Sequence, residues 1–535
     1  EKKTGRIRGR GGVQTQGSFT SKQSRPRTLQ QVENMRMAIP WELEGWQLLL
    51  CAALVLLFYL LYDRKHGKYS NLPPRVPGLP FFGNAFQIKG PEYLHIQLTE
   101  WGKTYGKIFT ITLFGQHFVA INSGEMLADM VHKDVFLTRT VRSYVVRRIM
   151  YECDDVSFRE TGHTHKQLRT TVMKALSECE SRLPLHKEEA VKLLETLLSS
   201  EGRPICVTHE INKSIANVLT VSLLGKRYNN EDLERMLEFG EVIDIVTMPG
   251  FGAELTALPF LRWFPVRSMK YIQVIEKLSR KFVDEECEKA MARFDPENVQ
   301  HVVDRVIELM KKKGTSMPDL TDRTVKGIMM DLYMAGWSTS SSVLNGLIIA
   351  LLNLPEEQRG LQKEVDSVVG PSRVPTLNDR EQMPYTQAFI AEGLRLFSVG
   401  TIGIRAAPTD VHYHGYFFPK GTQVLYNVWA ANHDPDVFKE PWSFRTDRYL
   451  DDESRLLPPG DLIWKRSLPF GEGKRICLGQ VFARDRLFIY IATLMQRLSF
   501  LPVDGVPPPS YDPRTFRQSV IIYPHPFDVR VIPRD

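Results

Sequence analysis

The sequence contains little cysteine, which excludes a fold held together by disulfides. Six cysteines are spread over 535 residues, far fewer than in the densely cross-linked scaffolds of small secreted proteins. Five of them lack a CxxC partner and are interpreted as plain reduced thiols, which favours a reducing compartment: Cys51, Cys153, Cys179, Cys206 and Cys287. The sixth, Cys477, lies in a glycine-rich loop and needs a different explanation.

The main part of the chain also lacks an excess of basic charge. The formal net charge is +7, but residues 1–40 alone hold nine cations and two anions, so residues 41–535 balance at zero. A protein that binds nucleic acid carries its basic surface on the folded part. The charge distribution therefore predicts no nucleic-acid partner.

Long hydrophobic runs are rare, and the exception is residues 45–62, GWQLLLCAALVLLFYLLY, with no charge in 18 residues. A membrane-spanning helix needs about 17–25 apolar residues. The run exceeds a signal-peptide core of about 7–15 residues, and no small-residue cleavage site follows it. We predict an uncleaved transmembrane anchor at 41–63. The cations that follow it place the C-terminal side in the cytoplasm.

Residues 1–40 are predicted to be a basic, disordered extension. Their cations oppose the orientation just assigned to the anchor. Met37 begins the stretch MAIPWELEGWQLLL and would make a natural start, so we expect residues 1–36 not to belong to the working protein. The alternative is a transit peptide, which is also Arg-rich and poor in acids, and it would direct the protein to the mitochondrial inner membrane.

The remaining sequence predicts a mainly α protein with a smaller β portion. Residues 64–84 form a proline-rich hinge, and residues 107–123 have strand composition with a turn at Gly115. Helical patterns dominate residues 127–352 and include one long helix at 324–353, whose middle is distorted by Gly336 and a group of hydroxyl residues. A further helix starts at or just after Cys477. Residues 85–535 are predicted to be one catalytic domain without internal repeats.

Residues 470–479, FGEGKRICLG, place one cysteine between cations and a helix start. Unpaired N–H groups and the helix dipole stabilise a thiolate there, and the glycines permit close approach of a flat cofactor. A zinc or iron–sulfur site would need ligands from elsewhere. The pairs His163/His165 and His412/His414 are better explained by surface placement.

This loop resembles the haem-binding loop of the cytochrome P-450 superfamily, FxxGx(R)xCxG. Other resemblances follow in the family's order: AGWSTS (335–340) to its (A/G)Gx(D/E)T(T/S) element, EGLR (392–395) to ExxR, and TDRY (446–449) to PERF. The proline spacer resembles the microsomal hinge. The resemblance covers about residues 41–535 and leans toward the vertebrate microsomal group with drug-metabolising and steroid 17-hydroxylating enzymes.

The resemblance implies a cytochrome P450 fold with an N-terminal transmembrane helix and haem b (iron protoporphyrin IX) as cofactor. Cys477 would be the proximal iron ligand. The implied haem-binding residues are Arg475, Arg169 and Arg405, which would pair with propionates, together with His165, Phe470 and Gly471. Glu392, Arg395 and Arg448 would form a buried charge network.

Two positions depart from the family. His165 stands where a Trp is usual, four residues before Arg169; it would either donate to a propionate or face solvent. Ser338 stands where an acid is usual, before the retained Thr339. Ser338 and Thr339 are the predicted catalytic pair for proton relay, but a serine cannot act as an acid near neutral pH. We therefore expect altered proton delivery.

The function implied is a monooxygenase at the endoplasmic reticulum membrane, with its catalytic domain in the cytoplasm. It would insert one oxygen atom into a steroid, fatty acid or xenobiotic, using NADPH electrons from NADPH-cytochrome P450 reductase, with cytochrome b5 as a second donor. The alternatives are a reductase-independent isomerase or dehydratase of lipid peroxides, and a non-catalytic haem carrier or sensor. By resemblance, the pocket is walled by five segments: 144–156, 248–260, 335–339, 399–402 and 517–520.

Overall fold

The computed structural model describes residues 71–535 except 81, 134, 140–142, 183, 247, 249–250, 314–319 and 535, and also residues 53, 54 and 57. The described residues belong to one compact unit, Pro40–Asp535. The predicted extension at 1–40, and all of the predicted anchor except residues 53, 54 and 57, lie outside them. The anchor therefore stays a prediction.

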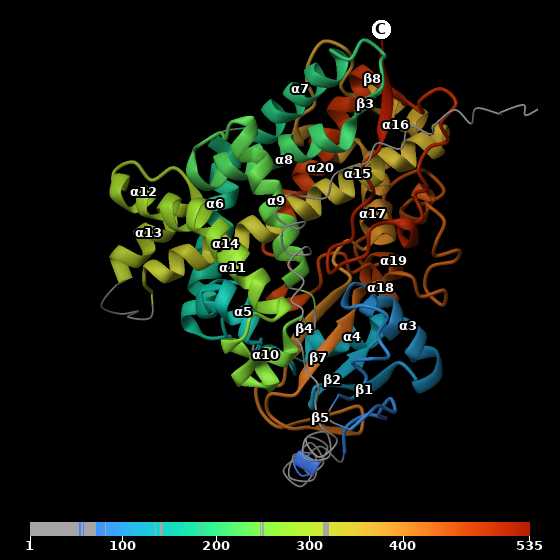
Figure 1. Cartoon of the computed structure of the whole chain (residues 1–535). Helices are drawn as coiled ribbons and strands as arrows, with labels where there is room; N and C mark the ends of the chain where they lie inside the picture. The colour runs from blue at the N-terminus through green and yellow to red at the C-terminus, as the bar shows by residue number, and fades with distance from the viewer. Residues whose placement is uncertain are drawn as a thin grey trace, which may run out of the picture. The chain divides into compact units, whose positions relative to one another are not determined.

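Helices make up most of the described chain, as the sequence predicted (Figure 1). The α-helices are α3 (Leu94–Tyr105), α4 (Gly124–His132), α5 (Tyr144–Ile149), α6 (His163–Arg182), α7 (Leu185–Leu198), α8 (Val207–Leu224), α9 (Asn230–Val246), α10 (Ala253–Ala257), α11 (Arg267–Ser279), α12 (Glu285–Arg293), α13 (Val302–Lys313), α14 (Asp322–Gly336), α15 (Ser338–Asn353), α16 (Pro355–Val368), α17 (Pro384–Phe397), α18 (Val428–Asn432), α19 (Leu462–Arg466) and α20 (Gln480–Arg497). The strands are β1 (Ile108–Leu113), β2 (Gln116–Ile121), β3 (Ile205–Cys206), β4 (Ile402–Ala406), β5 (Val411–Tyr413), β6 (Tyr416–Phe418), β7 (Gln423–Asn427), β8 (Leu498–Leu501) and β9 (Asp528–Pro533).

The largest sheet has the order β1-β2-β7-β4 and brings residues near 120 beside residues near 425. β1 and β2 form the predicted antiparallel hairpin, with Ile108 opposite Ile121, and Gly115 in its turn has a φ of +73°, which suits a residue without Cβ. β2 pairs parallel with β7, and β7 pairs antiparallel with β4. The end of β4 thereby reaches the site described below.

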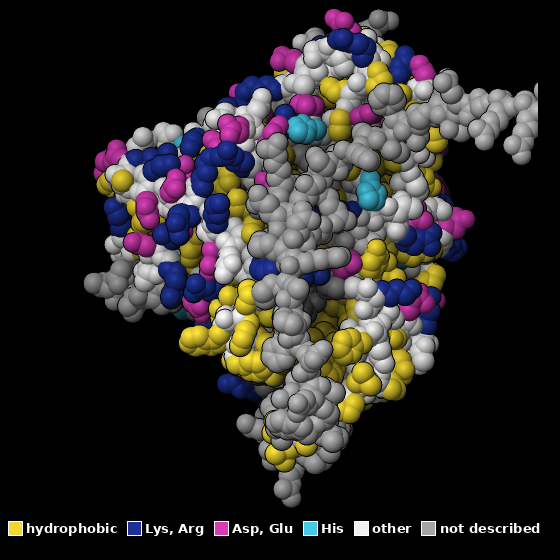
Figure 2. Space-filling view, in the orientation of Figure 1, with side chains coloured by type: hydrophobic (Ala, Val, Ile, Leu, Met, Phe, Trp, Pro, Cys, Tyr) yellow, Lys and Arg dark blue, Asp and Glu magenta, His cyan; other side chains and the backbone are white. Residues whose placement is uncertain are grey.

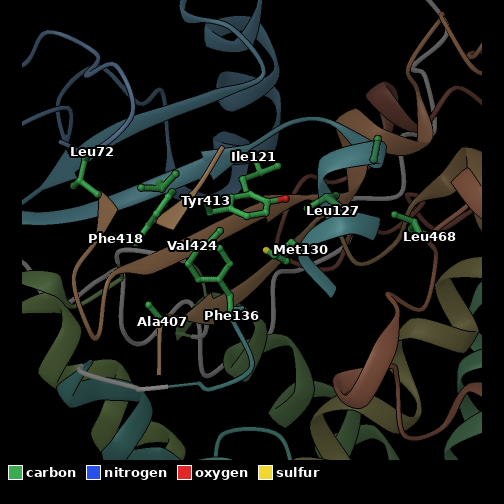
Figure 3. Close-up of a cluster of buried hydrophobic side chains, with 12 residues drawn as sticks. Leu72, Ile121, Leu127, Met130, Phe136, Ala407, Tyr413, Phe418, Val424 and Leu468 are labelled. Carbon is green, nitrogen blue, oxygen red and sulfur yellow. The ribbon is translucent and has the colours of Figure 1, made fainter. Parts of the chain in front are cut away.

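A buried apolar cluster covers one face of this sheet (Figure 3). Val119 and Ile121 of β2 and Val424 of β7 are fully buried within it. The Phe136 ring meets Tyr413 and Phe418 edge-on, with centroids 5.7 and 5.1 Å apart. Aromatic pairs in this geometry add stabilisation beyond the buried area. The cluster packs against β2 and β7 and so fixes the position of β4, which pairs with β7.

The long helix predicted at 324–353 is two helices, α14 and α15, broken at Trp337. The two run through the core (Figure 1), and their combined stretch Asp322–Asn353 is apolar enough to cross a membrane, but 83% of its most apolar window is buried inside the protein. The Trp337 ring packs where a Cβ on Gly240 of α9 would lie, only 2.4 Å from that Cβ. Arg486 of α20 donates to the Gly336 carbonyl at 2.9 Å. The break is therefore held by tertiary contacts, which the local sequence does not show.

The sequence of residues 248–266 is strongly apolar but interrupted by glycine and proline, which fits either a hydrophobic lid or a buried loop. The described residues of this segment include α10 and a 3-10 helix at Pro259–Trp263. Its apolar side chains point outward: Trp263 is 89% exposed, and Phe260 and Phe264 are more than half exposed. Figure 2 shows hydrophobic side chains gathered over this part of the molecule. A purely buried loop is excluded for these residues.

Candidate functional site

The cysteine loop is shaped by two glycines with left-handed backbone. Gly471 and Gly473 have φ of +66° and +71°, and a Cβ on Gly473 would come within 2.2 Å of Val131. The Cys477 amide donates to the Phe470 carbonyl at 2.9 Å, which closes the turn. α20 begins at Gln480, just after the cysteine, as predicted.

Cys477 is the exposed one among the cysteines that the structure describes, although the protein around its thiol is dense enough to desolvate it strongly. Burial raises the pKa of the thiol, although an N–H at Gly479 and the Arg169 charge act in the opposite direction. The N–H group after the cysteine thus stabilises the thiolate as predicted, but desolvation is the larger effect in the protein alone. A bound metal cation would reverse this balance.

The other described cysteines have no such setting. Cys153, Cys179 and Cys287 are buried and Cys206 is partly buried. Burial raises the pKa of Cys153 and of Cys287 to about 12. A thiol in an apolar surrounding is inert, which supports their interpretation as plain reduced thiols.

Three predicted arginines converge on the cysteine loop. Arg169 of α6 donates to the Ile476 carbonyl, and Arg405 of β4 donates to the Arg475 carbonyl at 3.3 Å. Arg475 itself is buried and donates to the Val156 and Arg159 carbonyls at 3.2 and 2.7 Å. The structure thus brings residues from α6, β4 and the loop to one place.

Arg139, which the sequence did not single out, completes an arginine cluster with Arg169, Arg405 and Arg475. Burial and then the other arginines lower the pKa of Arg475 to about 9, and burial is also the main cause that lowers the pKa of Arg405 to about 10. The Nε of Arg475 and of Arg139 are buried and unpaired. Mutual repulsion and unpaired donors make this cluster a site for an anion.

The arginine cluster fits the two carboxylates of haem, and Cys477 beside it fits a thiolate ligand to iron. Two acids are near, Asp155 and Asp331, but burial raises the pKa of both, and the Asp331 charge further raises that of Asp155. These carboxyls are therefore poor internal counterions for four arginines. The four arginines suit a cofactor that carries two negative charges, and the Cys477 thiol suits a metal in it that takes a soft ligand.

His165 is buried beside Arg475, so the alternative that it faces solvent is wrong. Its Nε2 lies 2.6 Å from Nη1 of Arg475. Since guanidinium only donates, this nitrogen accepts, and the other ring nitrogen carries the proton. Burial, then the charges of Arg475 and Arg169, lowers the pKa of His165 to about 4, so the ring is neutral near pH 7.

A cavity of about 310 Å³ lies next to the helix break and is lined by residues from all five predicted pocket segments. Its walls are mainly apolar and include Phe118, Val146, Met248, Ala335 and Val520. Thr339 lies one turn after Ala335 and donates to its carbonyl at 2.9 Å. The predicted catalytic pair thus begins α15 beside a cavity of ligand size.

Asp244 and Asp331 also line this cavity, and the sequence analysis missed both. Asp331 Oδ2 accepts from the Ser157 amide at 3.0 Å. Asp244 lies in the apolar run VIDIV of α9, and a single charge in such a run is a signal that could have been used, because buried charges need partners. For Arg139, which stands among several arginines, the sequence holds no comparable signal.

The predicted charge network is present behind the site. Glu392 and Arg395 of α17 are fully buried and form a two-bond ion pair at 2.7 and 2.8 Å. Arg448 Nε lies 3.3 Å from the same carboxylate. Arg395 also donates to the Asn432 and Pro441 carbonyls at 2.9 Å, which ties α17 to the segment before the cysteine loop.

Known proteins place these features in one family. A sequence model described as Cytochrome P450 matches residues 73–531. The chain is 30% identical to cytochrome P450 1A1 of Limanda limanda over 482 residues, which cover 84% of this chain and 90% of that protein. It is 28% identical to steroid 17-alpha-hydroxylase/17,20 lyase of Gallus gallus over 483 residues, covering 87% and 93%. With the family match spanning the cysteine loop, the arginine cluster and the cavity, the chain belongs to the cytochrome P450 family.

Proposed function

We propose that this haem-dependent monooxygenase inserts one atom of dioxygen into an apolar small molecule held in the 310 Å³ cavity. The electrons would come from NADPH through a reductase. The observation that carries the proposal is Cys477, a cysteine with accessible surface on the loop to which Arg169 and Arg405 donate hydrogen bonds. When bound, the haem supplies the dioxygen activation that no side chain provides.

In this proposal the protein holds the cofactor from two directions. Cys477 supplies the iron ligand, and Arg169, Arg405 and Arg475 bind the carboxylates at the edge of the macrocycle. His165 orients Arg475 through the contact between Nη1 and Nε2. Because Arg169 and Arg405 also donate to loop carbonyls, the same residues would fix the position of the cysteine.

The hydroxyl groups of Ser338 and Thr339 would hold and pass protons beside the cavity. Thr339 Oγ1 now donates to the Ala335 carbonyl at 2.9 Å, and Ser338 Oγ to the Met334 carbonyl at 3.2 Å. A hydroxyl that passes a proton must release such a bond and accept another proton in its place. Neither residue is an acid, so the proton must reach them from a further group or from water.

The cavity lining supports an apolar substrate. A mainly apolar wall favours a steroid, a fatty acid or an apolar xenobiotic, because burial of apolar surface drives binding. One relative is named as a steroid 17-alpha-hydroxylase/17,20 lyase, and a steroid is of the right chemical type for such a wall. A panel of the three classes, scored by the optical spin-state shift of the haem, would rank them.

We place the enzyme at the endoplasmic reticulum membrane with its catalytic domain in the cytoplasm. The exposed Phe260, Trp263 and Phe264 support membrane contact. On the cysteine-loop side, the exposed Lys465 and Lys474 suit an acidic flavoprotein surface such as that of a reductase, or of cytochrome b5.

The test compares wild type with Cys477→Ser and Cys477→His. The carbon-monoxide difference spectrum of the reduced wild type should show the thiolate band, and both variants should lose it. An unchanged band would overturn the ligand assignment. With reductase and NADPH, oxygenated product should form only when NADPH is consumed. Turnover of lipid peroxides without NADPH would instead identify an isomerase or dehydratase.

A further inference from the structure

One wall of the cavity places an acid among apolar side chains. Asp244 lies in the last turn of α9 and lines the cavity, and Met248 and Phe251, which follow it in the chain, line the cavity as well. Val242 and Val246, two residues to either side of Asp244, are buried, whereas Asp244 keeps 7% of its surface accessible. A carboxyl group in such a wall is costly unless it is hydrogen-bonded, so its partners indicate what it does.

The Asp244 carboxylate is held by a phenol from the C-terminal segment. Tyr523 donates its hydroxyl hydrogen to Asp244 Oδ2, and Val520 and Ile521, just before Tyr523, line the same cavity. Burial, followed by the Asp244 charge, raises the pKa of Tyr523 well above its usual value. The phenol therefore stays protonated and remains the donor of this bond, so Asp244 is the acceptor.

The segment around Tyr523 is fixed by backbone hydrogen bonds. The Tyr523 amide and carbonyl pair with Arg517 at 3.1 and 2.7 Å, and the Ile522 amide donates to the Val399 carbonyl at 3.1 Å. The Ile522 carbonyl accepts from Ser342 Oγ of α15 at 2.5 Å. The phenol thus has a fixed place beside the cavity, and so has the carboxylate that it contacts.

A carboxylate in this position can recognise one kind of ligand group. It has about four acceptor positions and, when ionised, no donor, and Tyr523 uses one of these positions. A ligand can add a bond only if it donates, as a hydroxyl does. An ether or a ketone offers no donor, and a second carboxylate would be repelled. Arg139 is the cation among the lining residues that the structure describes, but it belongs to the arginine cluster that suits the haem carboxylates.

The other acid in the described lining, Asp331, is less suited to a ligand. It accepts from the Ser157 amide at 3.0 Å, and burial raises its pKa. Its charge also acts on the Cys477 thiol, so it belongs to the side of the cavity near the cysteine loop. Asp244 comes from a different helix and is held by the C-terminal segment, so it can bind a different part of a ligand.

We propose that the substrate carries a hydroxyl group on an otherwise apolar body, and that Asp244 accepts a hydrogen bond from this hydroxyl. Asp244 is then a specificity-determining residue, and an apolar alcohol is the substrate class. The assignment rests on the proposed monooxygenase function and narrows its substrate classes: a hydroxylated steroid or a long-chain alcohol fits, whereas a fatty acid with its carboxylate at this wall does not. A hydroxyl is preferred to an ammonium because a charge costs far more to take out of water.

The first test measures binding without turnover. Equilibrium dialysis of the haem-loaded protein, without NADPH, compares labelled decanol and androstanol with their methyl ethers, which keep the oxygen and lose the donor. Each alcohol should bind about tenfold more tightly than its ether, because the acceptor is charged. Decanoic acid should bind more weakly than decanol, because its carboxylate meets the charge of Asp244.

The second test changes the side chains. Asp244→Leu should bind alcohol and ether equally. Asp244→Asn, whose amide group also donates, should bind decanoic acid more tightly than wild type does. Tyr523→Phe leaves the carboxylate in place and should keep the preference for the alcohol. The control Gln116→Leu removes another polar side chain from the cavity lining and should also keep it.

A double variant guards against a loss of folding in Asp244→Leu, which leaves the Tyr523 hydroxyl without this acceptor. Asp244→Leu combined with Tyr523→Phe replaces both partners by apolar groups, a change that can be nearly neutral for stability. It should lose the preference for the alcohol in a folded protein. If the preference survives in the double variant, Asp244 is not the group that recognises the hydroxyl, and the proposal is overturned.

The remaining outcomes separate this proposal from the proposed function. A wild type that binds alcohols and ethers equally, or that binds neither, would overturn the alcohol assignment. Tighter binding of decylamine than of decanol would also overturn it, because the recognised group would then be a cation. If wild type prefers the alcohols but forms no NADPH-dependent product from them, the monooxygenase proposal fails and the alcohol preference stands.

Discussion

Two groups of buried arginines in this protein differ in how their charge is balanced. Arg395 and Arg448 share the Glu392 carboxylate, at 2.7 and 3.3 Å. Among the described residues, no carboxylate is paired in this way with the arginine cluster around Cys477, and burial followed by neighbouring arginines lowers the pKa of Arg475. The first group is complete within the chain and stabilises the fold. The second is balanced only when an external dianion binds.

The largest expected effect is in the balanced group. Glu392→Ala would leave Arg395 buried and unpaired, so the free energy of unfolding should fall by about 3–5 kcal/mol. Urea denaturation of the haem-loaded protein measures it. Glu440→Ala is the matched control, because its pair with Arg445 is largely exposed, and it should cost about 0–1 kcal/mol. Equal losses of unfolding free energy in Glu392→Ala and Glu440→Ala would show that Arg395 does not depend on the buried carboxylate.

The next effect, that of Arg405→Met, differs in sign between the haem-loaded and the haem-free protein. Arg405→Met should make haem dissociate about tenfold faster, since a hydrogen bond to a charged group contributes roughly 1.5–3 kcal/mol. In the haem-free protein the same change removes one charge from a repelling cluster. It should therefore leave the free energy of unfolding unchanged or raise it.

Transfer of haem to an excess of apomyoglobin measures the first rate, and urea denaturation of haem-free protein measures the second quantity. Arg395→Met provides the contrast, because it leaves Glu392 unpaired and should destabilise both forms. A haem-free protein that Arg405→Met clearly destabilises would show that the cluster is balanced by the chain itself.

The smallest effect is on pH dependence. Burial lowers the pKa of His95 to about 4, and burial with two arginine charges does the same for His165. Each histidine binds a proton more weakly when folded, so both should cost stability as pH falls from about 6.5 toward 4. From pH 7 to 5.5 this amounts to about 1 kcal/mol per histidine, at 1.36 kcal/mol per pKa unit.

Bound carboxylates should raise the pKa of His165 and leave His95, which hydrogen-bonds to Gln518, unaffected. In the haem-loaded protein His95→Gln should thus flatten the pH profile more than His165→Gln does. Denaturation at pH 7 and pH 5.5 measures this. Equal flattening by the two changes would place the haem carboxylates away from His165.

Much of the site could be predicted because its residues are contiguous. FGEGKRICLG puts the thiol, the glycine turn and Arg475 within ten residues, and i, i+3 spacing on α17 is enough to pair Glu392 with Arg395. The hairpin at Gly115 and the helix after Cys477 follow equally from local composition. Such features depend on neighbours in the chain, which the sequence shows directly.

The parts that were missed depend on distant neighbours. The distortion next to Gly336 was predicted, but the contacts of Gly240 and Arg486 that fix the break at Trp337 were not. Arg139 likewise joins the arginine cluster only through folding. The sequence also does not show how strongly burial raises the pKa of Cys477, against the N–H group at Gly479. None of these contacts leaves a local pattern.

The sequence by itself determined the family's cysteine loop, the arginines predicted to bind propionates and the departure at Ser338. Tertiary structure decided which side chains meet at the cavity wall, since Tyr523 donates to Asp244 of α9 although the two are 279 residues apart. The physical reason is the distance along the chain over which each effect acts. Turn and capping preferences act over a few residues, whereas burial, repulsion and hydrogen-bond chains are set by whatever the fold brings together.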